Sequence, residues 1–103
     1  MPAFIEPCDY VIRFGPEANA YGDDYVGVVC VRRLNENEVE IIGYSPGRDE
    51  LPADMAHWHR DVLRCLARYG FRSAVRRKIK DGHMVHEHHF DLTHDLRHEE
   101  RNG

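Results

Sequence analysis

The sequence contains no long hydrophobic run. Its longest uncharged apolar stretch, Tyr25 to Val31, falls far short of the ~18 residues that a membrane-spanning helix needs. The first residues, Met1 to Glu6, show no basic region followed by an apolar stretch, so we expect no secretory signal. These absences argue against a membrane protein and predict a cytoplasmic location.

Cysteine is scarce and wrongly spaced for a structural role. Cys8, Cys30 and Cys65 form an odd set without a C-x-x-C spacing, which argues against a disulfide framework or a thiolate zinc knuckle. We expect all three to be buried free thiols, with Cys65 in the core. The sequence also lacks a glycine-rich phosphate loop, a G-x-S-x-G motif and a paired-carboxylate signature.

What the chain does contain is typical of one small folded domain. It has 103 residues, of which 42% are hydrophobic and 31% are charged. This balance excludes disordered and collagen-like chains, and the length suits a single domain. We predict one α+β domain over residues 1–92, followed by a polar tail over residues 93–103.

Charge is distributed unevenly, although the net charge is only −4. Residues 1–55 carry 11 acidic and 4 basic side chains, residues 56–80 carry 1 and 8, and residues 81–103 carry 6 and 2. A basic block between acidic flanks is typical either of a nucleic-acid face or of charge complementarity within a folded chain or dimer. We favour complementarity, because the predicted hairpin described below pairs some of these bases with acids.

The first half of the chain predicts three strands. Tyr10 to Phe14 alternates between apolar and polar side chains, and Tyr25 to Leu34 is β-branched almost throughout, as in a strand that is buried on both faces. Turn residues follow at 35–37, and Val39 to Tyr44 reads as a third strand. We expect the second and third strands to form a hairpin.

Helical periodicity extends from about Pro52 to Tyr69. Apolar side chains recur every three or four residues, which predicts one buried stripe: Met55, Trp58, Val62, Cys65, Leu66 and Tyr69. Pro52 suits the first turn of a helix. Gly70 suits the left-handed conformation that ends a helix, and we expect Phe71 to pack back on Leu66 as in a Schellman motif.

Asp81-Gly82 stands between two extended runs and predicts a tight hairpin with a type I′ turn. In an unbroken register the outer face pairs Lys80 with His83, Lys78 with Val85, Arg76 with Glu87, Ala74 with His89 and Arg72 with Asp91. The inner face pairs Ile79 with Met84, Arg77 with His86, Val75 with His88, Ser73 with Phe90 and Phe71 with Leu92.

The predicted fold is α+β, with the order βββαββ and a mixed, mostly antiparallel five-stranded sheet. Strand-helix-strand connections within a sheet are nearly always right-handed. The strand after Gly70 should therefore lie parallel to the strand at 39–44, with the helix over one face. A single helix leaves the other face open, so we expect the N-terminal segment, the tail or a second subunit to cover it, and we predict a homodimer.

This order of elements, with Ala67-Arg68-Tyr69-Gly70-Phe71 closing the helix, resembles the central part of the GNAT acyl-CoA transferase fold. The likeness covers about residues 25–90 and is greatest to short GNAT-like proteins of phages and mobile elements. GNAT enzymes bind the CoA pyrophosphate with a V-x-P-x-x-R-G-x-G-type loop at the helix N-terminus. The matching stretch from Tyr44 contains Arg48 but is one residue short, lacks the second glycine and places Asp49 and Glu50 where phosphates would lie. The resemblance therefore implies the fold core without a CoA cofactor.

Histidine is the one chemical excess of the chain, with eight residues, six of them between His83 and His98. His86 and His88 are two apart on a predicted strand and share a face, so they suit one zinc or nickel ion together with Asp91 or a tail histidine. His94 and His98 would share a face if the tail is helical. Structural packing is the alternative that we favour, because the sequence shows pairs of ligands rather than a set of three or four.

The leading functional hypothesis is a small non-catalytic module that acts on another protein by surface contact, with no cofactor. The rival is a metal-binding protein, which could be a hydrolase. A third option is nucleic-acid binding through the basic side chains of residues 60–80, which lack the interleaved aromatic residues of single-strand binders. These six side chains are the predicted interaction surface: Arg64, Arg68, Arg72, Arg76, Lys78 and Lys80.

Overall fold

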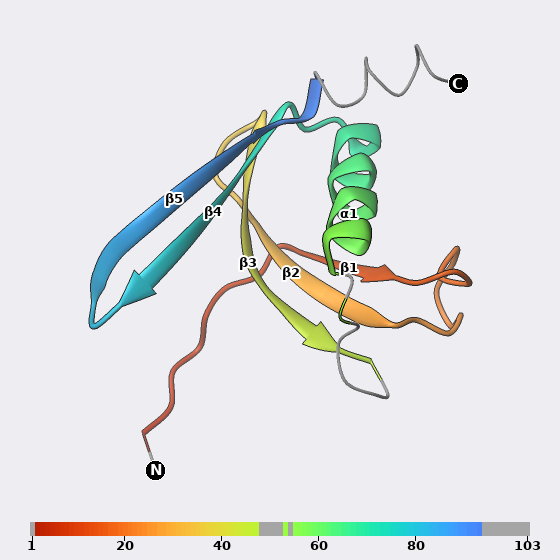
Figure 1. The fold of residues 1–103 in the computed structure, drawn as a ribbon, viewed down its shortest axis with the longest axis horizontal. Helices are drawn as coiled ribbons and strands as arrows, with labels where there is room; N and C mark the ends of the chain where they lie inside the picture. Colours follow the sequence, from red (N-terminus) through yellow and green to blue (C-terminus); the bar gives the residue numbers. More distant parts are fainter. Residues whose placement is uncertain (1, 48–52, 54, 94–103) are drawn as a thin grey trace.

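The computed structural model describes residues 2–47, 53 and 55–93, and it contains five strands and one helix in that part of the chain (Figure 1). The strands and the helix have these bounds: β1 Tyr10–Phe14, β2 Gly27–Arg33, β3 Glu38–Pro46, α1 Met55–Tyr69, β4 Ser73–Lys80 and β5 His83–Asp91. The predicted α+β class and βββαββ order are confirmed. The predicted helix start at Pro52 lies outside the described residues.

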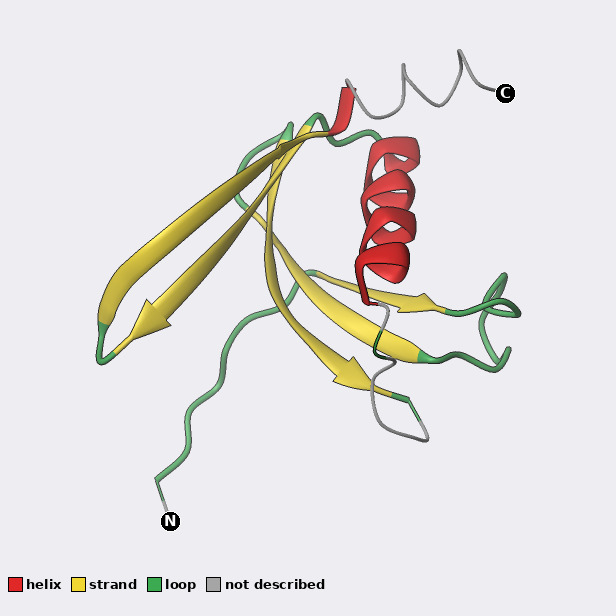
Figure 2. Ribbon diagram, viewed as in Figure 1, coloured by secondary structure: helices red, strands yellow, loops and turns green. Residues whose placement is uncertain are grey.

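The five strands form one sheet in the order of the sequence, β1-β2-β3-β4-β5 (Figure 2). The β2–β3 hairpin is antiparallel, and β4 runs parallel to β3, as predicted. The parallel pairing covers only three residue pairs, from Glu38–Ser73 to Glu40–Val75. Beyond Val75, β4 pairs only with β5, and this end of the hairpin projects away from the helix (Figure 1). We call residues 76–88 the hairpin arm and the remainder the body.

Helix α1 covers one face of the body. Its buried side chains, Val62, Leu63 and Leu66, pack against buried residues of β1, β2 and β3 such as Val31 and Ile41. The helix ends in the predicted Schellman motif: Phe71 N donates to Leu66 O at 3.1 Å, and Gly70 N donates to Ala67 O at 3.2 Å. Gly70 has φ of 121°, which favours glycine.

The buried stripe of α1 is rotated from the prediction. Leu63, which the predicted stripe left out, is buried, whereas Cys65 and Tyr69 are exposed. Because α1 lies towards the β1 edge of the sheet (Figure 1), one flank of its apolar stripe extends beyond the strands. All three cysteines are free, but Cys8 is also exposed and Cys30 is half-buried, so the prediction that they are buried was wrong.

The β4–β5 hairpin has the predicted turn but not the predicted register. Asp81 and Gly82 both have positive φ, 54° and 78°, as a type I′ turn requires. Lys80 faces His83 and Ile79 faces Met84, but a β-bulge then shifts every following pair by one residue. The pairs beyond it are Lys78–His86, Arg77–Glu87, Arg76–His88, Val75–His89, Ala74–Phe90 and Ser73–Asp91.

The bulge exchanges the two faces of β4 relative to the prediction. Ala74 pairs with Val39 and Phe90, which lie on the helix side, so Ala74, Arg76 and Lys78 share that side. The predicted pairs Arg72–Asp91 and Phe71–Leu92 are wrong by one residue, because Leu92 N donates to Arg72 O. Phe71 and Leu92 nevertheless belong to one core cluster.

Charged side chains cover part of the face opposite α1. Glu40 on β3 is 9% exposed and forms ion pairs with Arg32 of β2 and, at 3.4 Å, with Arg77 of β4. Arg77 continues to Glu87 of β5 at 3.3 Å. This ionic ladder covers the chain's own sheet, and Val75 is completely buried. On β2 only one face is fully buried and the other is half-buried, so the predicted two-sided burial is only partly correct.

No helix among the described residues is long and apolar enough to cross a membrane.

Candidate functional site: the groove between β1 and α1

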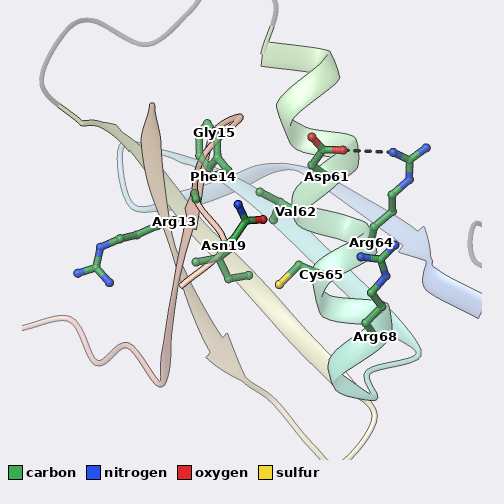
Figure 3. A pocket seen from close by; sticks show the side chains of 11 residues that line it. Arg13, Phe14, Gly15, Asn19, Asp61, Val62, Arg64, Cys65 and Arg68 are labelled. Carbon is green, nitrogen blue, oxygen red and sulfur yellow. Dashed lines mark hydrogen bonds and ion pairs between the residues drawn. The ribbon is translucent and has the colours of Figure 1, made fainter. Parts of the chain in front are cut away.

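A groove runs between strand β1 and helix α1. It consists of two open pockets of about 380 and 240 Å³ that share Ile12, Arg13 and Cys65. Figure 3 shows the larger pocket, with the Cys65 side chain pointing into the space between the strand and the helix. We call the two pockets together the β1–α1 groove.

One end of the β1–α1 groove is apolar. Its lining includes Tyr10, Leu66 and Phe71. The rings of Tyr10 and Phe71 meet edge to face at 5.7 Å, and Tyr69 stacks on Phe71 at the same centroid distance. Tyr69 is 68% exposed despite this stacking. The apolar end therefore offers aromatic and aliphatic surface to a ligand without any change in the core.

The other end of the groove is polar and mainly basic. Arg64 and Arg68 project from α1 beside it, and Asn19 approaches from the loop between β1 and β2 (Figure 3). Asp61 is the acid of this end, and it accepts a hydrogen bond from Arg64 at 3.2 Å. Arg13 points away from the pocket in Figure 3, and its guanidinium lies over Tyr25 at 5.4 Å. This end therefore carries more basic than acidic side chains.

The strand that forms one wall of the groove is an edge strand. Among the described strands, β1 pairs only with β2, so its other side presents backbone N–H and C=O groups outward. An exposed edge strand can pair with an extended chain, since main-chain hydrogen bonds supply affinity and side-chain pockets supply selectivity.

A row of rings lies on the helix side of β5 and continues onto α1. The ring centroids of His86 and His88 are 6.1 Å apart, those of His88 and Phe90 are 4.5 Å apart, and those of Phe90 and His59 are 4.9 Å apart. His59 Nδ1 is hydrogen-bonded to the hydroxyl of Tyr44. His59, His86 and His88 therefore make ring contacts, although His86 and His88 are exposed.

The titration of the Tyr44–His59 pair follows from its burial. Burial raises the pKa of Tyr44 to about 12, with Arg76 acting in the opposite direction. Burial lowers the pKa of His59, and Arg76 and His88 lower it further. Both groups are therefore neutral at pH 7. They border an open pocket of about 320 Å³ that Met55, Ala56 and Arg76 also line.

The predicted metal ligands are brought together only in part. His86 and His88 share a face as predicted, but side chains alternate along a strand, so Asp91 lies on the opposite face with its partner Ser73. His94 and His98 lie outside the described residues. Within the part of the chain that the structure describes, no three His, Cys, Asp or Glu side chains are placed to hold a metal ion.

The six predicted interaction residues belong to separate places. Arg64 and Arg68 border the β1–α1 groove, whereas Arg76 lies over the ring of Tyr44 at 5.4 Å. Arg72 lies in the turn between α1 and β4, and Lys78 and Lys80 are exposed on the hairpin arm. The basic residues that lie close together in the sequence are therefore divided among the groove, the turn after α1 and the hairpin arm.

Comparison of the chain with protein-family models, with curated proteins and with solved structures found no match.

Sequence reasoning did not predict the β1–α1 groove. The clue was present in the apolar residues of β1 and in Cys65 and Tyr69 at one side of the helical stripe. Their exposure depends on where the helix lies across the sheet, and periodicity alone does not determine that position.

Proposed function

We propose that the protein is a small non-catalytic interaction module that binds an extended segment of a partner protein in the β1–α1 groove. The observation that supports this proposal is the position of two adjoining pockets beside an edge strand. An extended segment placed there would add a strand to β1. Its side chains on one face would then enter the groove, because alternate side chains of a strand point the same way.

The lining of the groove defines the chemistry of the partner segment. Tyr10, Ile12 and Tyr69, which are at least partly exposed, favour an aromatic or aliphatic side chain at one end. Arg64 and Arg68 favour a carboxylate at the other end, where an arginine can form charge-assisted hydrogen bonds. We therefore expect a segment that combines an apolar anchor with acidic residues.

A displayed library of random peptides, panned against the purified protein, tests this proposal. The enriched peptides should carry a bulky apolar residue near one or more acids. Their binding should weaken strongly for Arg68→Glu. Binding should remain unchanged for Arg60→Glu, a matched charge reversal at an exposed helix residue outside the groove lining. Peptides that bind equally well to both variants would contradict the proposal.

The GNAT-like architecture remains part of the proposal. It is supported by the shared order of strands and helix, while Arg48, Asp49 and Glu50 of the expected phosphate loop lie outside the described residues. We expect no CoA binding, because two carboxylates in that loop repel a pyrophosphate. Titration of the protein with CoA, followed by calorimetry, should show no heat of binding. Saturable binding would favour a transferase.

Metal binding is the second candidate, because the adjacent rings of His86 and His88 provide two ligands on one face. Metal analysis of the purified, untagged protein distinguishes it from the interaction module. Stoichiometric zinc or nickel that disappears in a His86→Ala, His88→Ala double variant would establish the metal protein. The interaction module predicts substoichiometric metal in both forms.

A further inference from the structure

Among the described strands β5 pairs only with β4, so it forms the second edge of the sheet. The direction of its backbone groups follows from one hydrogen bond. Leu92 N donates to Arg72 O at 3.0 Å. In an antiparallel ladder, successive residues alternate between facing the partner strand and facing away. His86, His88 and Phe90 therefore direct their backbone groups towards β4. Glu87 and His89, which lie between them, direct theirs outward at the open edge.

The bulge between Met84 and His86 limits the usable part of this edge. Beyond it the pairing with β4 is regular from His86 to Asp91. β5 is largely exposed along its length. A long exposed edge is a template for pairing with another strand.

A second copy of β5 fits in one antiparallel register. Outward-facing residues must meet outward-facing residues, so the registers near the centre place Glu87 opposite Glu87, His89 opposite His89, or Glu87 opposite His89. The first opposes two carboxylates, and the second moves Glu87 opposite Asp91. Only the third places Glu87, which also contacts Arg77 and His89 of its own copy, across from an imidazole, with Asp91 opposite Val85. Like charges directly opposite each other are destabilising.

The same register joins the ring rows of the two copies. His88 meets His88 of the second copy at the two-fold axis, and His86 meets Phe90. These pairs are of the non-hydrogen-bonded type, in which the Cα atoms are about 4.5 Å apart and the side chains are closest. The two Glu87–His89 pairs are of the hydrogen-bonded type and supply about four backbone hydrogen bonds.

We propose that two copies of the chain pair antiparallel through the open edges of β5, with His88 on the two-fold axis and Glu87 facing His89 of the second copy. Two observations support this pairing. The backbone groups of Glu87 and His89 point outward, and this register places Glu87 of each copy opposite His89 of the other. The result is a continuous sheet across both copies. This proposal goes beyond the proposed function, because neither β1 nor α1 takes part and both β1–α1 grooves remain open.

Cysteine cross-linking tests the register. Cys8, Cys30 and Cys65 are first replaced by Ser, Ala and Ser, and His88→Cys is then introduced and oxidised mildly in the presence of a chelator. Residues at the axis lie within the Cα separation that a disulfide accepts, so covalent dimer should be the main product. His86→Cys is the matched control: its two copies would lie about 13 Å apart along the strand and should remain monomeric.

Proline substitution tests the edge independently. His89→Pro removes an outward N–H and leaves the ladder to β4 intact, as edge strands tolerate, whereas His88→Pro removes an N–H that faces β4. In sedimentation velocity, we expect the unsubstituted protein to shift towards dimer as concentration rises, and His89→Pro to stay monomeric with an unchanged circular dichroism spectrum. His88→Pro should lose folded signal as well.

The proposal is overturned by equal cross-linking of His86→Cys and His88→Cys, by a dimer that persists in His89→Pro, or by a dimer that forms only when zinc is added. A protein that is monomeric at every concentration overturns it as well. None of these results affects peptide binding in the β1–α1 groove, so failure here is distinguishable from failure of the proposed function.

Discussion

The body and the hairpin arm come from one chain but are stabilised in different ways. In the body, side chains such as Val29, Val31 and Val39 are completely buried beneath α1. In the arm, none of residues 76–88 is buried, and Ile79, Met84 and Val85 are each more than half exposed at its far end. The body is held by apolar burial, whereas the arm is held by its turn, its ladder and its charges.

The arm contributes no buried side chain to the core, so the stability of the fold depends mainly on the body. Strands β4 and β5 run continuously from the body into the arm. The ion pair of Arg77 with Glu40 and the contact of Arg76 with the ring of Tyr44 also join the two regions. The arm has no core of its own. Its exposed apolar side chains and the outward edge of β5 are therefore available for contact with other molecules, and we expect truncation of those apolar side chains to leave the fold intact.

We expect the greatest loss in the free energy of unfolding at a buried isoleucine of the body, compared with an exposed isoleucine of the arm. Ile41 is 1% exposed and Ile79 is 59% exposed. Ile41→Ala should lower the free energy of unfolding by about 2–5 kcal/mol, because it removes buried methyl groups and leaves a cavity. Ile79→Ala should change it by less than about 0.5 kcal/mol. Urea denaturation of the two variants provides the measurement, and similar losses would contradict the division into body and arm.

A smaller loss in the free energy of unfolding is expected when the ion pairs between the body and the arm are weakened. Glu40→Gln should lower the free energy of unfolding by about 1.5–3 kcal/mol, because Arg32 and Arg77 lose a charged hydrogen-bond partner that is largely shielded from water. Glu87→Gln is the matched change on β5 and should cost less, since it lies towards the outer end of the ladder. Chemical denaturation in low salt ranks the two, and a larger loss for Glu87→Gln would reverse our assignment.

A smaller effect appears as pH dependence. The pKa of His59 in the folded chain is below the ordinary value of 6.5, so the unfolded chain binds more protons between those two pKa values. The free energy of unfolding should therefore fall as the pH drops below 6.5. His59→Gln should reduce this slope. An unchanged slope in this variant would show that His59 is not responsible.

The elements themselves were predictable because their signals are local. Gly70 and Phe71 ended the helix as expected, and Asp81-Gly82 formed the expected turn. The register beyond the turn was not predictable in the same way. β5 carries polar or histidine side chains on both faces, so a slip by one residue loses little burial, and register is weakly specified in such strands.

The candidate site was less predictable than the fold. The pairing of His86 and His88 on one face follows from the period of a strand, and the structure confirms it. The β1–α1 groove depends instead on the lateral position of α1, which leaves Cys65 and Tyr69 exposed. That position is set by the packing of Val62, Leu63 and Leu66 against the sheet, a tertiary property that no local pattern encodes.

Amide hydrogen exchange with a library-selected peptide tests the central claim most directly, because it compares the two edges of the sheet in one experiment. Saturating peptide should slow the exchange of amides in β1, Tyr10–Phe14, and leave those of β5, His83–Asp91, unchanged at the same protein concentration. Protection confined to β5, or no protection at β1, would contradict the assignment of the β1–α1 groove as the binding site.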